Sequence, residues 1–247
     1  MALFVTTDLS CNSMNDTPRN SKFIDVSIPL SSATPIWPTD PPVQIRQKRT
    51  QLSSGGIATG SRLEISAHFG THIDAPLHYA CSGLSIDQLP LETLVGPCRV
   101  YEHHGDQHIT KNDLDAMGFM PGRRVLFKTR NSLDLRAGRM DASFLSLLPD
   151  AVDHLIASNV EVLGIDGLSI GPFGEVTDTV HVAFCGAGGI ILEMLDLSEV
   201  EPGDYHMIAL PLKLVGVEAS PVRVVLVRPE DAGEVLREDQ EDEFEET

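Results

Sequence analysis

The stretch His68–His78 reads HFGTHIDAPLH and contains three histidines and one aspartate within eleven residues. These four side chains occupy positions 68, 72, 74 and 78, which are all even. Successive side chains of an extended strand alternate between its two faces, so this parity predicts that all four point to one face. An α-helix would turn Asp74 away from the face shared by His68 and His72, and Pro76 disfavours a helix. The sequence therefore predicts an extended segment with a row of metal-ligand side chains.

The positions between these side chains predict what surrounds them. Phe69, Ile73 and Leu77 are large and apolar, which suits a buried opposite face, and Gly70 is expected to leave room for an ion or a substrate. Imidazole nitrogens with a carboxylate oxygen suit Zn²⁺, Mn²⁺ or Fe²⁺. Because no thiolate is offered, the site is expected to stay open to water, as catalytic metal sites do. The alternative is a chance run of histidines, which four ligand-type residues on one face argue against.

Length and charge limit the classes of function. The 247 residues predict one large domain, and 42% apolar and 22% charged residues are ordinary for a soluble globular protein. The formal net charge of −18, from 36 acidic and 18 basic residues, argues against nucleic acid or an anionic membrane as the main partner. Between Glu230 and Thr247, ten acidic residues and one basic residue carry half of that charge. This segment is expected to be a disordered tail.

The cysteines and the N-terminal residues predict a cytoplasmic protein. Cys11, Cys81, Cys98 and Cys185 lie far apart without a CxxC pair, so neither a disulfide framework nor a thiolate zinc site is expected. They are predicted to be free thiols in a reducing compartment. No signal peptide is expected, because the first residues lack a basic region and a long apolar core. No apolar run approaches the roughly 18 residues of a spanning helix.

Local patterns predict a mixed α/β protein in which strands outnumber helices. Helices are expected over 111–117, with Thr110 as N-cap, and over 149–158, with Pro149 in the first turn. Short helical turns are expected over 84–94, and Gly55, Gly56 and Gly60 are expected to mark a turn region. Strands are expected over 23–29, 43–48, 98–101, 124–128, 160–165, 205–210 and 222–227. The order lacks the regular alternation of a Rossmann or (β/α)-barrel fold.

HFGTHIDAPLH resembles the HxGTHxDxPxH signature of the bacterial kynurenine formamidase and putative cyclase family of metal-dependent hydrolases. The resemblance runs from Phe23 to Arg228 and includes ATPIWPTD, LGIDGLSI and the block that begins at His181. It implies a single α/β domain with a β-barrel-like core of the swivelling β/β/α type, assembled as a homodimer or homotetramer. The implied organisation is a flexible arm over 1–22, a catalytic domain over 23–228 and an acidic disordered tail over 229–247.

The resemblance also implies roles for seven residues. His68, His72 and Asp74 resemble the ligands of a first metal ion, and Asp74 would bridge to a second ion. His181 and Glu193 resemble further ligands, so that one or two Zn²⁺ ions, or Mn²⁺, are expected. His78 resembles the catalytic acid/base, and Trp37 resembles the residue that packs on the substrate ring.

The distal members of this set are weak signals by themselves. A lone His181 is more often a satisfied polar residue than a ligand, and Trp37 could equally be a packing residue. Glu193 lies among apolar residues in IILEMLDL, and a buried carboxylate there needs a partner such as a metal ion.

The implied activity is hydrolysis of an amide or formamide C–N bond by a metal-dependent amidohydrolase. The leading substrate is N-formyl-kynurenine, which an arylformamidase of tryptophan catabolism converts to kynurenine and formate. The alternatives are an isatin-hydrolase-like cyclic amide or lactone hydrolase and a cyclase of secondary metabolism. A metal-binding module without turnover is the alternative outside enzymes. The partner is expected to be a small aromatic amide.

Other motifs in the sequence leave the substrate open or favour competing functions. The family often has a Thr-Pro-Ser-x-Asp segment where this chain has Gly167–Gly171, GLSIG, which leaves the exact substrate open. GLSIG also fits the GxSxG nucleophile elbow, with Asp196 and His206 following, but an elbow must lead into a helix. A dinucleotide fingerprint at Cys185 would need glycine where Ile191 stands. A third cluster, of His103, His104 and His108, is expected to be a solvated loop.

Overall fold

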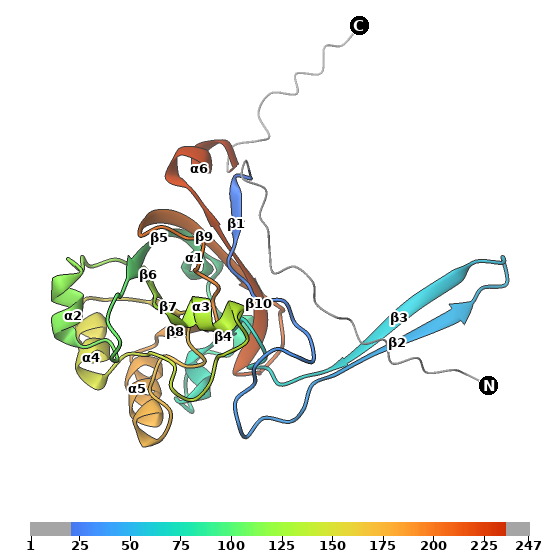
Figure 1. Ribbon diagram of the computed structural model, residues 1–247, viewed down its shortest axis with the longest axis horizontal. Coiled ribbons are helices and arrows are strands. Elements are labelled where there is room, and N and C mark those ends of the chain that lie inside the picture. The colour runs from blue at the N-terminus through green and yellow to red at the C-terminus, as the bar shows by residue number, and fades with distance from the viewer. Residues whose placement is uncertain (1–20, 236–247) are drawn as a thin grey trace, which may run out of the picture.

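The computed structural model describes residues 21–235, and its strands form one closed, mixed β-barrel with a separate hairpin (Figure 1). The strands run in the order β10-β4-β8-β7-β6-β5-β9, and β9 pairs back to β10 to close the ring of seven. The strands of the barrel are β4 (His72–Asp74), β5 (Val95–Glu102), β6 (Arg124–Lys128), β7 (Val162–Ile165), β8 (Ile190–Glu193), β9 (Gly203–Pro211) and β10 (Ala219–Val227). The short β1 (Phe23–Asp25) pairs antiparallel with β10.

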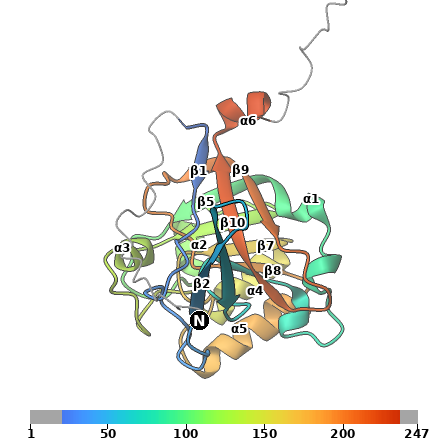
Figure 2. The ribbon, with the colours of Figure 1, turned by 90° about the vertical axis from the view of Figure 1, so that its right-hand side faces the viewer.

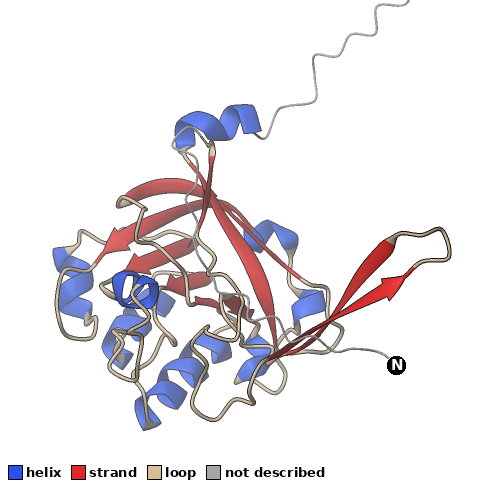
Figure 3. Cartoon of the chain, turned by 45° about the vertical axis from the view of Figure 1, so that its right-hand side comes forward, coloured by secondary structure: helices blue, strands red, loops and turns tan. Residues whose placement is uncertain are grey.

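The barrel has a parallel half and an antiparallel half. Strands β5, β6, β7 and β8 are parallel neighbours, and β4, β9 and β10 pair antiparallel. Parallel neighbours need long crossovers, which here carry helices. These helices are α2 (Lys111–Ala116), α3 (Asn131–Arg136), α4 (Pro149–Ala157) and α5 (Glu175–Gly186). Helices α2, α4 and α5 lie together on one side of the barrel (Figure 1, Figure 3).

Alternation along the strands separates two apolar cores. In β6, Leu126 joins the core inside the barrel, while Val125 and Phe127 pack with the helices outside it. In β8, Leu192 faces the interior and Ile191 faces the helices. These strands are buried on both faces, which explains their continuous apolar sequence. The space between the barrel and its covering helices is therefore a second interior. Polar side chains of β4 and β8 that point into it can be shielded from water.

The structure confirms most of the predicted elements. The helix predicted over 149–158 is α4, and the one over 111–117 is α2, where the Thr110 hydroxyl accepts a hydrogen bond from the Asp113 amide. The turns predicted over 84–94 are the 3-10 helix η2 (Ile86–Gln88) and α1 (Leu91–Leu94). All seven predicted strands are present, although β1 ends at Asp25, well before the predicted position 29.

The prediction for the glycine-rich region was incomplete. Gly55 and Gly56 lie in a turn, but Gly60 lies inside a strand. Strand β2 (Gln44–Gln51) and strand β3 (Ile57–Glu64) form an antiparallel hairpin. The hairpin projects from the barrel in Figure 1 and Figure 3 and points toward the viewer in Figure 2. Neither face of this hairpin is buried, so β3 carries no apolar alternation that would predict a strand.

The two ends of the chain lie largely outside the described residues. The predicted arm over 1–22 is described only at residues 21 and 22, and the predicted tail only to residue 235. Residues Pro229–Val235, predicted to be disordered, instead form helix α6, and Glu234 in it pairs with Lys22. Over residues 21–235, no helix is long and apolar enough to cross a membrane. Cys81, Cys98 and Cys185 are free thiols, as predicted, and Cys11 lies outside the described residues.

Candidate metal centre

Strands β4 and β8 supply the centre of the site. His72 and Asp74 point away from the barrel interior, which Ile73 fills between them. Glu193, the last residue of β8, lies directly opposite His72 in the antiparallel pair. The Nε2 atom of His72 lies 3.3 Å from Glu193 Oε2 and 3.5 Å from Asp74 Oδ1. All three side chains are almost completely buried on the helix-covered side of the barrel.

The prediction of one extended segment over His68–His78 was wrong, because β4 contains only three residues. His68 lies in a turn that continues to Gly70, which has a φ of +68°, and His78 ends the 3-10 helix η1 (Pro76–His78). A left-handed glycine before the strand and a proline that begins a helical turn after it both bend the chain.

The bends nevertheless bring His68 and His78 to the same place as the strand residues. The Nδ1 atom of His68 lies 2.9 Å from Asp74 Oδ1, and the Nε2 atom of His78 lies 4.0 Å from Asp74 Oδ2. The sequence thus predicted correctly that the four side chains lie together, but it did not predict the turn and the 3-10 helix that bring them together.

Gly70 has a different role from the expected one. Its positive φ favours glycine, and a Cβ atom at this position would lie 2.1 Å from a terminal methyl carbon of Leu30, whose side chain would have to move. The space for a ligand is not created by Gly70. The neighbouring Thr71 connects two parts of the chain, because its hydroxyl donates to the Met194 carbonyl at 2.6 Å and accepts from the Ile28 amide.

Helix α5 brings His181 to the site. Its Nε2 atom lies 3.3 Å from Glu193 Oε1, which also accepts a hydrogen bond from the Ile170 amide at 2.7 Å. Met194, which follows Glu193, has a left-handed φ of 55°. Non-glycine residues seldom adopt this conformation, and those that do are concentrated at functional sites. Here it ends β8 directly after the carboxylate.

Backbone carbonyls fix the orientation of two imidazoles. The Nδ1 atom of His72 lies 2.8 Å from the Gly70 carbonyl, and the Nδ1 atom of His181 lies 2.8 Å from the Thr177 carbonyl. A carbonyl oxygen only accepts, so Nδ1 carries the hydrogen in both rings. Each Nε2 is then free to bind a cation, and this carbonyl support is usual for metal-binding histidines.

Buried polar atoms without well-aligned partners give a direct test of the metal prediction. Among residues 21–235, His72 Nε2 and both carboxylate oxygens of Asp74 are buried without a well-aligned hydrogen bond, although Asp74 Oδ1 lies 2.9 Å from His68 Nδ1. Such groups cost free energy unless something satisfies them. Two triads present nitrogen and oxygen atoms within 4.8 Å of one another, and they share Asp74: His68, Asp74 and His78, and His72, Asp74 and Glu193. These residues fit one or two divalent cations with mixed nitrogen and oxygen ligands.

The carboxylates dominate the electrostatics of the site. Burial lowers the pKa of His68, but the adjacent Asp74 outweighs burial and the pKa rises to about 9. Burial also lowers the pKa values of His72 and His181, but Asp74 and Glu193 outweigh it at His72, and Glu193 with Asp74 outweighs it at His181, so that both pKa values are raised. Although burial opposes ionisation of Asp74 and Glu193, the surrounding imidazoles hold both pKa values below the ordinary range. The site therefore favours positive charge between its carboxylates.

His78 differs from the other three histidines. Burial has the largest effect on its pKa, and the net pKa lies below the ordinary value. Its ring lies 4.4 Å from that of His68 and 4.5 Å from that of Tyr79, measured between centroids. A neutral imidazole beside a cation site can accept a proton, as a general base must.

A cavity of about 200 Å³ lies over the ligands. Trp37 lines it, and its ring lies 5.0 Å from Phe173 and 6.4 Å from Phe144, between centroids. Trp37 is thus a packing residue that also lines the cavity, and its contact with a substrate ring stays a prediction. The cavity is lined further by residues that the sequence analysis did not identify: Asp40, Tyr79, Leu168, Thr177, Asp178 and Met194. Asp40, Leu168 and Met194 lie in the segments ATPIWPTD, GLSIG and IILEMLDL, and Tyr79 follows His78, whereas no signal in the sequence marked Thr177 or Asp178.

The GLSIG segment does not form a nucleophile elbow. Ser169 lines the cavity, and its hydroxyl lies 3.0 Å from that of Thr177. Helix α5 begins only at Glu175, and Asp196 pairs with Arg136 at 2.9 Å. These contacts contain no serine–histidine–aspartate chain.

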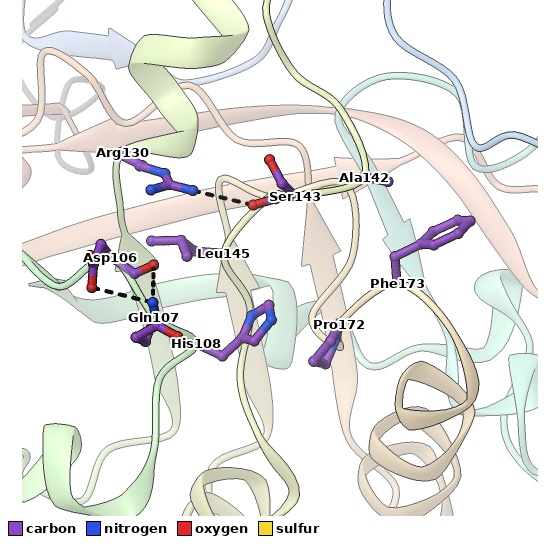
Figure 4. A pocket seen from close by; sticks show the side chains of 9 residues that line it. All are labelled: Asp106, Gln107, His108, Arg130, Ala142, Ser143, Leu145, Pro172 and Phe173. Atoms are coloured by element: carbon purple, nitrogen blue, oxygen red, sulfur yellow. Dashed lines mark hydrogen bonds between the residues drawn. The ribbon is translucent and has the colours of Figure 1, made fainter.

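The cluster of His103, His104 and His108 separates in the structure. His103 bonds to the Gln107 carbonyl and His108 to the Ser146 hydroxyl, while His104 is exposed. His108 lines a second cavity of about 270 Å³ together with Arg130 (Figure 4). No metal-binding triad involves these histidines in the described part of the chain.

Comparisons with known proteins identify the family of the chain. The model of the putative cyclase family matches residues 24–172. A solved structure of a potential metal-dependent hydrolase with cyclase activity is 36% identical with a TM-score of 0.70, and the match covers 83% of this chain and 96% of that one. A predicted metal-dependent hydrolase from Bacillus stearothermophilus is 35% identical with a TM-score of 0.71, over 83% and 97% of the two chains.

Isatin hydrolase A from Ralstonia solanacearum is 25% identical with a TM-score of 0.72, over 83% of this chain and 91% of that one. The closed barrel, the ligand cluster and a family match over more than half of the sequence lead to one assignment: the chain belongs to the putative cyclase family.

Proposed function

We propose that the protein is a metal-dependent hydrolase that cleaves the C–N bond of a small aromatic amide. The observation that carries this proposal is the set of buried atoms of His72 and Asp74 without well-aligned hydrogen bonds, beneath a cavity walled by Trp37. A cation bound by these residues would lower the pKa of a water molecule and polarise the substrate carbonyl. Three of the proposed ligands, His72, Asp74 and Glu193, are held by the barrel wall, and His181 is held by α5.

Four residues of this chain have the remaining roles in proton transfer, orientation of the ligands and substrate binding. His78 takes a proton from the attacking water and donates it to the leaving nitrogen. His72 and His181 keep their Nε2 atoms directed to the cation because their Nδ1 atoms are held by carbonyls. Trp37 offers an aromatic face to the substrate ring, a contact that typically contributes about 0.5–1.5 kcal/mol beyond burial.

Two aromatic amides are the first substrates to test. The HFGTHIDAPLH motif favours an N-formylated aniline such as N-formyl-kynurenine, and similarity to isatin hydrolase A favours a cyclic amide such as isatin. Both reactions are attack of water on an amide carbonyl beside an aromatic ring. They differ in products, since the first releases formate and the second only opens the ring.

The experiment is metal removal followed by a substrate panel. A chelator should abolish hydrolysis, and Zn²⁺ or Mn²⁺ should restore it, with metal content followed by elemental analysis. Full activity in metal-free protein would contradict the proposal. A panel of aryl formamides, isatin, a lactone and an aliphatic amide then identifies the bond cleaved, and turnover of the aliphatic amide alone would exclude an aromatic substrate.

A further inference from the structure

The wall of the cavity over the metal ligands accepts hydrogen bonds, because the hydrogens of its hydroxyl groups are used inside the protein. The Tyr79 hydroxyl lines this cavity and donates to Asp178 Oδ1 at 2.8 Å. A carboxylate only accepts, so the phenol must be the donor of this bond. The phenolic oxygen can therefore offer a ligand its lone pairs and no hydrogen.

The other two hydroxyls of the wall are committed in the same way. The Thr177 hydroxyl donates to the Gly171 carbonyl at 3.3 Å, since a carbonyl oxygen only accepts. The Ser169 hydroxyl lies 3.0 Å from that of Thr177 and must then donate to it, while it accepts from the Gly171 amide at 3.3 Å. Apart from the imidazoles, Trp37 is then the one side chain in the described wall with a hydrogen to donate.

Two carboxylates outside the metal cluster complete this wall. Asp40 and Asp178 line the cavity, and neither belongs to a metal-binding triad among residues 21–235. Within the same residues, no cationic side chain pairs with either carboxylate, and no lysine or arginine lines the cavity. Cations bound between Asp74 and Glu193 would leave the charges of Asp40 and Asp178 uncompensated. The wall thus combines hydrogen-bond acceptors with negative charge.

We infer that the substrate is an aromatic amide that carries an ammonium group, which Asp40 and Asp178 bind away from the scissile bond. This inference rests on the proposed function and narrows its substrate class. An ammonium group donates up to three hydrogen bonds and carries a positive charge, so it matches both properties of the wall. Charge-assisted hydrogen bonds are roughly twice as strong as neutral ones. The net charge of −18 also attracts cations to the chain.

Other ligands fit this wall less well. A carboxylate substituent would meet Asp40 and Asp178, with no lysine or arginine in the described wall to pair with. It could bind at the metal site instead, but only in competition with the attacking water. A hydroxyl substituent can donate one hydrogen bond, without the gain from opposite charge. A bare metal ion at Asp40 and Asp178 would lack a third protein ligand among residues 21–235.

Formanilides matched in shape test the inference. Compounds with an aminomethyl, a hydroxymethyl or a carboxylate substituent, at the meta or para position, contain the same formamide bond and differ in charge. KM of the metal-loaded enzyme should be about tenfold lower for the aminomethyl than for the hydroxymethyl compound, and highest for the carboxylate. Added salt should reduce the difference, because it screens exposed charges. Equal KM values, or a preference for the carboxylate, would overturn the inference and leave the proposed hydrolysis intact.

Isosteric variants locate the effect in the wall. Asp40→Asn and Asp178→Asn each remove one charge, and each should reduce the KM ratio between the hydroxymethyl and aminomethyl compounds. Asp106→Asn is the matched control, because Asp106 lines the second cavity (Figure 4) and should leave the ratio at its wild-type value. A ratio that both wall variants leave unchanged, or that the control lowers equally, would contradict the assignment of these carboxylates.

Calorimetry separates binding from turnover. Benzylamine, which is protonated at neutral pH, should bind the metal-loaded protein more tightly than benzyl alcohol, and Asp40→Asn and Asp178→Asn should reduce this difference. An amine that bound only at the metal site would be insensitive to both variants, and that result would overturn the inference. If benzylamine shows the expected preference but no formanilide is cleaved, the cation-binding wall is supported and the proposed amide hydrolysis is contradicted.

Discussion

His78 is the residue whose role the geometry leaves most open to experiment. Its lowered pKa and partial exposure suit a base, yet its imidazole also completes a triad with His68 and Asp74. If His78 is the base, the substitution His78→Ala should reduce the rate of hydrolysis by a factor of about 10²–10⁴. Metal content should hardly change, because the buried ligands remain.

Elemental analysis beside kinetics distinguishes the two roles. Loss of metal in proportion to activity would make His78 a ligand instead of a base. His108→Ala is the matched control, because that imidazole lines the second cavity and should alter neither quantity.

Trp37 determines the expected preference for aromatic substrates. Its ring is held against Phe173 and Phe144, so its face toward the cavity is preorganised. Trp37→Ala should raise KM for aryl amides about tenfold, which corresponds to about 1.4 kcal/mol. Trp37→Phe keeps an aromatic face and should have a smaller effect. An equal rise in KM for aliphatic amides would show that the residue supports the fold of the loop and not the substrate ring.

At the scale of elements, Asp166 connects the end of β7 to helix α3. Its fully buried carboxylate accepts hydrogen bonds from the amides and hydroxyls of Thr129 and Ser132 and from the side-chain amide of Asn131. Asp166→Asn would turn an NH₂ group toward some of these donors. We expect a loss of about 1–3 kcal/mol in the free energy of unfolding, because buried donors would lose their acceptor.

Urea unfolding measures this loss as a lower midpoint with an unchanged slope. Asp134→Asn in α3 is the control, because Asp134 makes a solvent-accessible ion pair with Arg139. This pair should contribute less than about 1 kcal/mol to the free energy of unfolding. Equal effects of the two substitutions would show that the Asp166 network contributes little.

The elements that the sequence predicted are those with local signals. Helix α4 has an apolar stripe and an N-terminal proline, and α2 has its Thr110 cap. Strand β3 of the hairpin escaped prediction because all of its residues are exposed, so no apolar period marks it. Closure of the barrel depends on the long-range pairings of β5 with β9 and of β4 with β10, which followed only from the family resemblance.

The sequence predicted which side chains form the site better than it predicted the backbone that carries them. The parity of positions 68 to 78 correctly grouped four ligand-type residues, although only His72 and Asp74 share a strand. His181 and Glu193 came from the resemblance, since a single polar residue in an apolar segment does not reveal its partner. Asp178 and Thr177 line the cavity from one turn of α5, and nothing in their local sequence marks them.

On the scale of the whole molecule, charge is distributed unevenly, and the C-terminal segment carries much of it. Residues 236–247 have seven acidic residues and one basic residue, a net charge of −6 out of −18. Exposed charges typically contribute little to stability, and salt screens them beyond about 8 Å. Deleting residues 236–247 should therefore change the free energy of unfolding by less than about 1 kcal/mol, or roughly 2–4 °C in Tm.

A second deletion, of residues 229–247, tests helix α6 separately. This helix buries no residue, and its ion pair between Glu234 and Lys22 is solvent-accessible. Its removal should also cost less than about 1 kcal/mol, with the rate of hydrolysis unchanged, because the barrel closes without it. Calorimetry of the two truncated chains beside the full chain measures both steps. A large loss on the first deletion would show that the acidic segment docks on the body, and a large loss only on the second would assign that stability to α6.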